Sequence, residues 1–184
     1  MKGWLSPEIL LVLAGVFLIL ADSLAPLRLR RPLPSIALLL ALGILLWSLR
    51  PESQAFPACA SNLFVVDGLS ALFKPFVLVC LVAVLGMASR YRLDSDESVR
   101  GEFLALPFFP TAGLCLLVSA QDFLAVFVAL ELVSISLYLL AAFHRARPAS
   151  LEAGIKLLVM GGLSTGFLVM GIAWLYAGAG TTGF

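Results

Sequence analysis

The chain has 184 residues, of which 61% are hydrophobic and 12% are charged, and its mean hydropathy is +1.07. Soluble domains carry about a quarter of their residues as charged side chains, so this chain has about half of the usual share. This composition excludes a soluble globular enzyme. The formal net charge of +1 gives no reason to expect nucleic acid or an acidic substrate as a partner.

The apolar residues fall into stretches that are long enough to cross a bilayer as helices. A hydrocarbon core of about 30 Å needs about 20 helical residues, so a chain of this length holds at most about six spans. We predict an all-α fold, a polytopic transmembrane helical bundle that forms a single transmembrane domain over residues 1–184. The predicted helices cover about residues 6–27, 33–49, 67–89, 101–120, 122–143 and 152–178.

The first predicted helix has a clear start signal. Ser6 is a good N-cap, Pro7 suits the first turn, and Glu8 lies where its charge stabilises the helix dipole. A cleaved secretory signal is the alternative, because Lys2 precedes the apolar run. The spanning length of the run and the arginines that follow it favour a transmembrane helix. Asp22, near its end, is interpreted as an interfacial residue.

The basic residues are distributed unevenly between the predicted connections. Only Lys2 and Arg50 lie on the side of the chain ends, and Lys74 and Lys156 lie within helices. The other eight lie after the first, third and fifth helices: Arg28, Arg30, Arg31, Arg90, Arg92, Arg100, Arg145 and Arg147. Because basic loops stay in the cytoplasm, the sequence predicts a multi-pass protein of the cell inner (plasma) membrane with both termini on the outer, periplasmic face.

Lys74 is the first ionisable residue well inside a predicted span. It lies about two turns into the third helix and precedes Pro75, which removes a helical hydrogen bond and frees backbone carbonyls near the ammonium. We therefore include Lys74 among the candidates for a proton pathway. Further along the chain, only Gln121 and Asp122 separate the fourth and fifth helices, which predicts a tight antiparallel hairpin with Asp122 as the cap.

Glu131 is the strongest functional candidate, because it lies near the middle of the fifth helix and cannot reach either interface. A charge at mid-depth costs about 2.5 to 3.5 kcal/mol on insertion scales, so this carboxylate needs a partner or a proton. At 100° per residue, Phe127, Glu131, Ser134 and Tyr138 fall on one helix face. This face indicates a proton or ion pathway through Glu131, Ser134 and Tyr138. A fixed ion pair that joins two helices is the alternative.

The sixth helix carries a second candidate, Lys156. It follows Glu152 by four residues, the favourable order for a helical ion pair. Snorkelling of the lysine to the inner interface explains its position equally well. Gly162 and Gly166 of the same helix form a G-x-x-x-G pair, which we interpret as packing within the bundle in preference to dimerisation.

Other chemistries lack support in the sequence. The cysteines, Cys59, Cys80 and Cys115, are far apart and form neither a zinc motif nor a disulfide framework. The single histidine, His144, lies in a basic loop and is interpreted as a solvated residue. The chain has no phosphate-binding loop and no nucleophile paired with a base.

Several stretches resemble the antiporter-like subunits of respiratory complex I. Residues 119–143, SAQDFLAVFVALELVSISLYLLAAF, look like the fifth-helix signature of these subunits, and VDGLS at residues 66–70 fits the same group. SLEAGIK at residues 150–156, GGLSTGFL at 161–168 and LYAGAGT at 175–181 resemble the subunit N (NuoN) family in particular. The resemblance covers about residues 65–184 and is only topological before them.

The resemblance implies a non-redox subunit of a proton-translocating NADH:quinone oxidoreductase. In that family the fifth-helix glutamate, matched by Glu131, modulates the charge of a lysine on a later helix, and Lys156 matches the sixth-helix lysine. Leu157 departs from the aromatic residue that usually follows it. The resemblance implies no cofactor bound by this chain, with NADH, FMN, iron-sulfur clusters and quinone bound elsewhere in the assembled complex.

The implied partners are the lipid bilayer and other membrane subunits of complex I. Family members have further helices, so we expect a separate or missing C-terminal half to supply the lysines that pair with Glu131.

Two alternative functions remain. One is a cation/proton antiporter or membrane-bound hydrogenase subunit, which shares the glutamate. The other is a truncated structural scaffold whose charges form static pairs.

Overall fold

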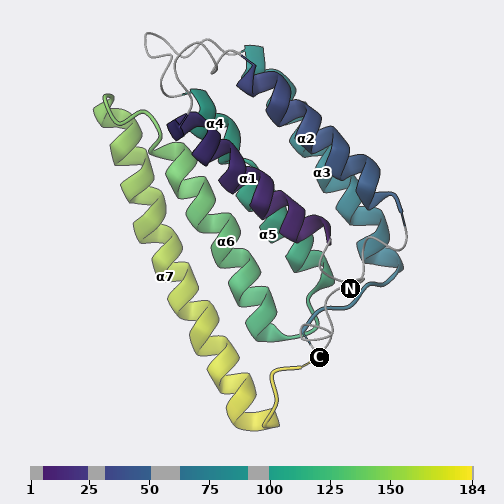
Figure 1. Ribbon diagram of the computed structural model, residues 1–184. Coiled ribbons are helices and arrows are strands. Elements are labelled where there is room, and N and C mark those ends of the chain that lie inside the picture. The colour runs from purple at the N-terminus through teal and green to yellow at the C-terminus, as the bar shows by residue number, and fades with distance from the viewer. Residues whose placement is uncertain (1–5, 25–31, 51–62, 91–99, 184) are drawn as a thin grey trace.

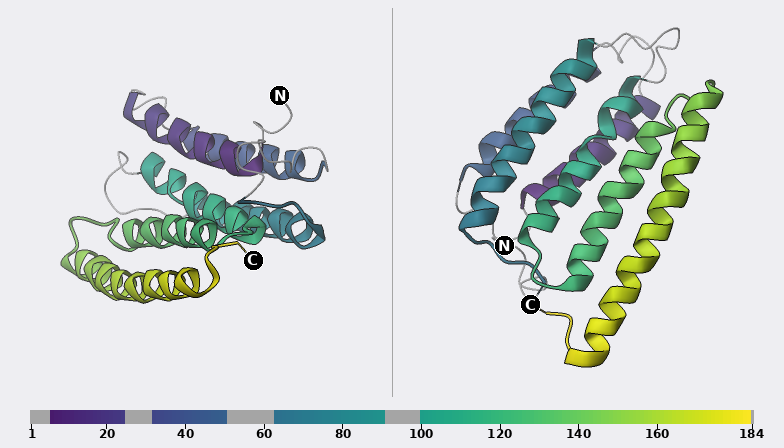
Figure 2. Two further views of the ribbon diagram at one scale, coloured as in Figure 1. Left: turned by 90° about the horizontal axis from the view of Figure 1, so that it is seen from below. Right: turned by 180° about the vertical axis from the view of Figure 1, so that it is seen from behind.

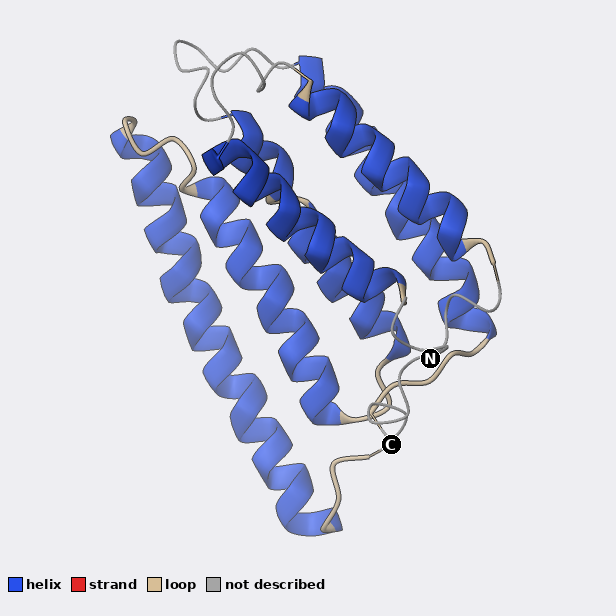
Figure 3. Ribbon diagram, in the orientation of Figure 1, coloured by secondary structure: helices blue, strands red, loops and turns tan. Residues whose placement is uncertain are grey.

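The computed structural model describes residues 6–24, 32–50, 63–90 and 100–183. These residues form seven helices (Figures 1 and 3). The β-type backbone pairings among them are isolated bridges. The helices are α1 (Pro7–Leu24), α2 (Leu33–Ser48), α3 (Gly68–Arg90), α4 (Arg100–Ala105), α5 (Phe108–Ser119), α6 (Phe123–Ala141) and α7 (Pro148–Ala179). The all-α prediction is therefore confirmed for this part of the chain.

The helices have the lengths and compositions of a polytopic membrane protein. Five spans within the described ranges are long and apolar enough to cross a membrane, with α4 and α5 together forming one of them. The apolar helix α2 has 16 residues and is shorter. Large apolar side chains are exposed along every span except the short α4, as expected where helices face lipid or other helices instead of water.

The fourth predicted helix is interrupted in the structure. The sequence predicts one helix over residues 101–120, whereas α4 ends at Ala105 and α5 begins at Phe108. Pro107 and Pro110 lack the N–H groups that would continue the α-helical hydrogen bonds. Instead, the Phe109 N–H donates to the Leu106 carbonyl at 3.3 Å, a tighter turn across the break. The last helix also differs, because α7 begins at Pro148, before the predicted residue 152.

Neighbouring helices run antiparallel and form two parts of the bundle. In the first part, α1 packs against α2, α4 and α5, and α3 packs against α2 and α5. In the second part, α6 packs on α5 and α7 packs on α6, so that α7 lies at the edge (Figures 1 and 2). Helix α5 therefore joins the two parts.

The chain termini lie at the same end of the bundle, which we call the terminal end (Figure 1). Three segments meet there. The Val65 N–H donates to the Ser119 carbonyl at 2.7 Å, and the Phe123 N–H donates to the Thr182 carbonyl at 2.9 Å. The end of α1, the end of α3 and the connection between α6 and α7 lie at the opposite end. Arg145 and Arg147 are exposed there, while Arg28, Arg30, Arg31 and Arg92 lie outside the described residues.

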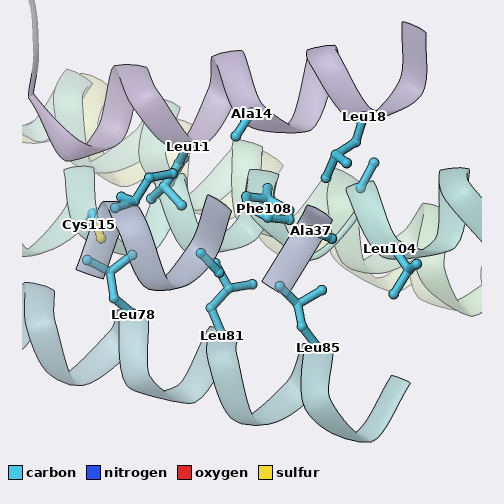
Figure 4. Close-up of a cluster of buried hydrophobic side chains, with 14 of the residues drawn as sticks. Leu11, Ala14, Leu18, Ala37, Leu78, Leu81, Leu85, Leu104, Phe108 and Cys115 are labelled. Carbon is cyan, nitrogen blue, oxygen red and sulfur yellow. The ribbon is translucent and has the colours of Figure 1, made fainter. Parts of the chain in front are cut away.

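The apolar core lies in the first part of the bundle. Leu78, Leu81 and Leu85 form a buried stripe on α3 that points toward α1 and α5 (Figure 4). Leu11 and Phe108 are fully buried opposite them. The spacing of three and four residues keeps these side chains on one helix face, so the core holds α1, α2, α3 and α5 together.

Helices α5 and α6 approach each other closely at Gly113. A methyl group there would lie 2.7 Å from Val133 Cγ2 and 2.9 Å from the Ala129 carbonyl oxygen. The second neighbour is backbone and cannot move aside alone. This glycine therefore sets the distance between α5 and the helix that carries Glu131.

We predict that Gly113→Ala lowers the free energy of unfolding by about 1 to 3 kcal/mol, because it forces α5 and α6 apart. The measurement is denaturant unfolding in detergent micelles followed by circular dichroism. Gly43→Ala is the matched control, since a methyl group at Gly43 meets nothing within 4 Å and alanine favours the helix. Equal stability of the two variants would contradict the packing role of Gly113.

The start of α3 is held by a reciprocal cap. The Ser70 N–H donates to Asp67 Oδ1 at 2.8 Å, and the Asp67 N–H donates to Ser70 Oγ at 2.9 Å. The bonds from the Ser70 backbone and side chain lower the pKa of the Asp67 carboxyl from its usual value of 3.8. The ionised form is thus the one that the folded chain stabilises.

A carboxyl whose pKa is lower in the folded state stabilises the fold above its unfolded pKa, and this stabilisation is lost as the pH falls through the folded pKa. We therefore predict that the first turn of α3 frays as the pH drops below about 4. Amide hydrogen exchange at Ser70 measures the fraying. Asp67→Asn should abolish this pH dependence, and its persistence in the variant would contradict the role of Asp67.

Candidate functional site

Glu131 lies within the second part of the bundle, where α6 packs on α7. Helix α6 runs over Phe123–Ala141, so its midpoint is Leu132 and Glu131 lies one residue away. The side chain is partly buried. The carboxylate is therefore near mid-depth of its span, as the sequence predicts, and needs a polar partner there.

Thr165 of α7 supplies this partner. Its hydroxyl Oγ1 donates a hydrogen bond to Glu131 Oε1 at 2.6 Å. A hydrogen bond to a charged acceptor is shorter and stronger than one between neutral groups. Because the Thr165 hydroxyl is neutral, this contact stabilises the carboxylate without neutralising its charge.

Tyr138 also faces α7 from the same side of α6. A methyl group on Gly161 would overlap the Tyr138 hydroxyl, so the phenol lies directly against the α7 backbone. The structure thus directs both Glu131 and Tyr138 toward α7, as their shared helix face predicts. Ser134 lies between them along α6 and is partly buried.

The glycines of α7 do not follow the predicted packing. A methyl group at Gly162 or Gly166 meets nothing within 4 Å. The interpretation of this G-x-x-x-G pair as a packing contact within the bundle is therefore wrong for the described residues. Gly161, one position earlier, makes the close approach, because it faces α6.

Two further polar contacts join α6 to the α7 segment at its ends. Ser150 Oγ donates to the Ala141 carbonyl at 2.6 Å, and Thr182 Oγ1 donates to Asp122 Oδ2 at 2.7 Å. Asp122 also accepts from the Leu124 N–H at 2.7 Å as the N-cap of α6, as predicted. The contact between Glu131 and Thr165 lies between these two ties.

The structure separates Lys156 from Glu131. Lys156 Nζ lies 2.5 Å from Glu152 Oε1, and the two side chains are 71% and 65% exposed. The pair follows the predicted i,i+4 spacing. It lies on a face of α7 that no described helix covers, so Lys156 does not neutralise Glu131 in this arrangement.

Lys74 lies in the first part of the bundle, away from α6 and α7. Its Nζ is 2.8 Å from Glu8 Oε1, and the side chains are 0% and 3% exposed. Helix α3 continues through Pro75 without a break. The sequence points to freed backbone carbonyls near Lys74, whereas the structure brings a carboxylate from α1 to it.

Sequence reasoning missed Thr165 and Glu8. A hydroxyl in the middle of an apolar helix is the only signal for Thr165, and Ser164 beside it carries the same one. Glu8 has the ordinary position of an acidic residue in a first turn. Neither residue reveals its partner in the sequence, since the partner depends on how the helices pack.

The described residues contain no group of histidine, cysteine and acidic side chains able to hold a metal ion. Cys80 is exposed and Cys115 is buried, and both are free thiols. Cys59 lies outside the described ranges.

The family "NADH:quinone oxidoreductase/Mrp antiporter, TM" matches residues 120–184, the segment that contains α6 and α7. NADH-quinone oxidoreductase subunit N from Paramagnetospirillum magneticum is 38% identical over 184 residues, which cover 97% of this chain and 36% of that protein. Subunit N from Nitrosomonas europaea is 35% identical over 95% of this chain and 36% of its own length. The chain matches the N-terminal part of subunit N.

Two solved structures have similar folds. The respiratory complex I from Thermus thermophilus with bound aureothin contains a chain with a TM-score of 0.73 and 27% identity, covering 96% of this chain and 38% of that one. An archaeal membrane-bound sulfane sulfur reductase has a TM-score of 0.66 at 19% identity, covering 96% of this chain and 37% of that one, which shows a shared fold. The chain thus spans little more than a third of the length of the relatives it matches.

The contact between Glu131 and Thr165 can be tested separately from any activity. We predict that Thr165→Val lowers the free energy of unfolding by about 1 to 2 kcal/mol, because the shape is kept and the partly buried acceptor Glu131 loses its donor. Detergent-micelle unfolding followed by circular dichroism measures this change.

Ser164→Ala is the control for this substitution. Its hydroxyl is exposed and donates within its own helix to the Met160 carbonyl at 3.0 Å. We expect its loss to change stability by less than about 0.5 kcal/mol. A Thr165→Val variant as stable as Ser164→Ala would show that the hydrogen bond to Glu131 contributes nothing to the packing of α6 on α7.

Proposed function

We propose that this chain is a non-redox membrane subunit of an NADH-quinone oxidoreductase and takes part in proton translocation. The observation that carries the proposal is the mid-depth carboxylate of Glu131, hydrogen-bonded by a neutral hydroxyl in the segment that matches the oxidoreductase/antiporter family. A carboxylate held in this way keeps a free oxygen for a proton, which a fixed ion pair would compete for.

In this proposal Glu131 alternates between carboxylate and carboxylic acid. The Thr165 hydroxyl donates to the carboxylate, and it can rotate to accept a hydrogen bond from the protonated form. Both states of Glu131 then have a partner in an apolar environment. Ser134 and Tyr138, on the same face of α6, extend the line of hydroxyl groups along the helix.

Lys156 has a supporting role in this scheme. It carries a positive charge near the start of α7, and its pairing with Glu152 at 2.5 Å holds this charge at one end of the helix. Lys74, in the other part of the bundle, is treated separately below.

The proposal extends to partners and location. The chain works with other membrane subunits of the complex, and NADH, FMN, iron-sulfur clusters and quinone are bound by other subunits of the assembled complex. It lies in the inner (plasma) membrane with both termini on the periplasmic face. The eight basic residues assigned to the opposite connections support this orientation.

We predict that Glu131→Gln slows proton translocation by the assembled complex about a hundredfold or more, the lower end of the range for a positioned proton acceptor. Glutamine keeps the shape and accepts the Thr165 bond, so assembly is expected to be unchanged. The measurement is NADH-driven proton uptake into vesicles that contain the purified complex.

Glu102→Gln is the control, because Glu102 is exposed in the first turn of α4. Wild-type proton translocation in Glu131→Gln would overturn the role of Glu131. The family description also includes Mrp antiporters, which supports a cation/proton antiporter subunit as the second candidate. Sodium/proton exchange in vesicles without quinone-linked NADH oxidation would favour this candidate.

A further inference from the structure

The buried ion pair of Glu8 and Lys74 has no part in the site on α6 and α7. It joins α1 to α3 with both side chains almost fully buried. Replacement of a buried ion pair by apolar residues is often neutral or stabilising, because the desolvation of two charges offsets their attraction. Packing alone therefore gives little reason to place these charges here.

Three buried polar atoms near the terminal end add to the pair. Ser6 Oγ, Ser119 Oγ and Glu8 Oε2 are buried and have no hydrogen-bond partner among the described residues. Ser6 immediately precedes α1 and Ser119 ends α5, so both serines lie at helix termini on the terminal end. Buried polar groups in proteins nearly always have a partner, and ordered water is the usual one where protein groups are lacking.

Helix α5 connects these atoms to the ion pair. Cys115 of α5 is fully buried in the core. It lies beside Leu11 and Leu78, which follow the two charged residues by three and four positions (Figure 4). Ser119 follows Cys115 by four residues and therefore lies one turn nearer the terminal end on the same face.

We propose that Glu8 and Lys74 form a second proton-binding site, which water held by Ser6 and Ser119 connects to the terminal end of the bundle. A hydronium ion there transfers its proton through this water to Glu8 Oε2. The hydronium becomes water and the carboxylate becomes a carboxylic acid, while Lys74 keeps its charge. Lys74 favours release, because a neighbouring cation stabilises the carboxylate.

This inference rests on the proposed function, since it assigns a second step to the same proton translocation. The test compares Glu8→Gln, Lys74→Met and the double variant Glu8→Gln/Lys74→Met in the purified complex. Each single variant removes one partner of this buried pair and leaves the other charge without its 2.8 Å contact, so reduced assembly is expected. The double variant leaves no unpaired charge and is expected to assemble.

The double variant distinguishes a role of the pair in proton binding from a role in stability alone. If the site binds a translocated proton, the assembled double variant shows about tenfold slower NADH-driven proton uptake into vesicles. Glu102→Gln again serves as the control. Proton uptake at the wild-type rate in the double variant would overturn the proposal and assign the pair to stability alone. Failure of the double variant to assemble would overturn it as well.

The same measurements distinguish this inference from the proposed function. If the wild-type complex translocates no protons during NADH oxidation, the proposed function fails. If the wild-type complex translocates protons and the double variant does so equally well, only the second site fails. Ser119→Ala gives an independent check, since it removes one water ligand without altering any charge, and we expect slower proton uptake with normal assembly.

Discussion

The unfavourable transfer of charged side chains into an apolar bundle governs this structure. Most of the chain consists of apolar helices that tolerate many arrangements, because lipid and helix surfaces are equally apolar. Charged residues are more selective, since each requires a polar partner at its own depth. Lys74 of α3 forms an ion pair with Glu8 of α1, and Glu131 of α6 accepts a hydrogen bond from Thr165 of α7. These contacts fix helix registers that apolar packing alone would leave open.

The features that sequence reasoning recovers are those that depend on one helix at a time. Length and hydropathy locate the spans, and the helical period places Glu131 and Tyr138 on one face. Contacts between helices are different. Thr165 is 34 residues from Glu131, and the pairing depends on the register of α7 against α6. Glu8 resembles an ordinary first-turn acid until α3 covers it. The break between α4 and α5 at Pro107 was predictable in principle, since proline removes a helical donor. The apolar pattern alone does not reveal it.

The two polar sites lie in different parts of the bundle, and α5 is the element that both parts share. It carries Cys115 and Ser119 toward the Glu8 region and presents Gly113 to α6. The close approach at Gly113 therefore positions the helix of Glu131 relative to the ion pair. A shift of α5 would alter both sites together, which gives the bundle a physical means of coupling them.

Helix α7 is attached to α6 near both of its ends, through Ser150 at one end and Thr182 at the other. These attachments restrict sliding of α7 along its axis, because a shift of one turn would break both. They also restrict rotation about the axis, since both hydroxyl groups lie off the axis and would turn with the helix. A rotation would carry the Thr165 hydroxyl sideways, out of reach of Glu131. The two end attachments therefore keep α7 at the angle at which the Thr165 hydroxyl reaches the central carboxylate.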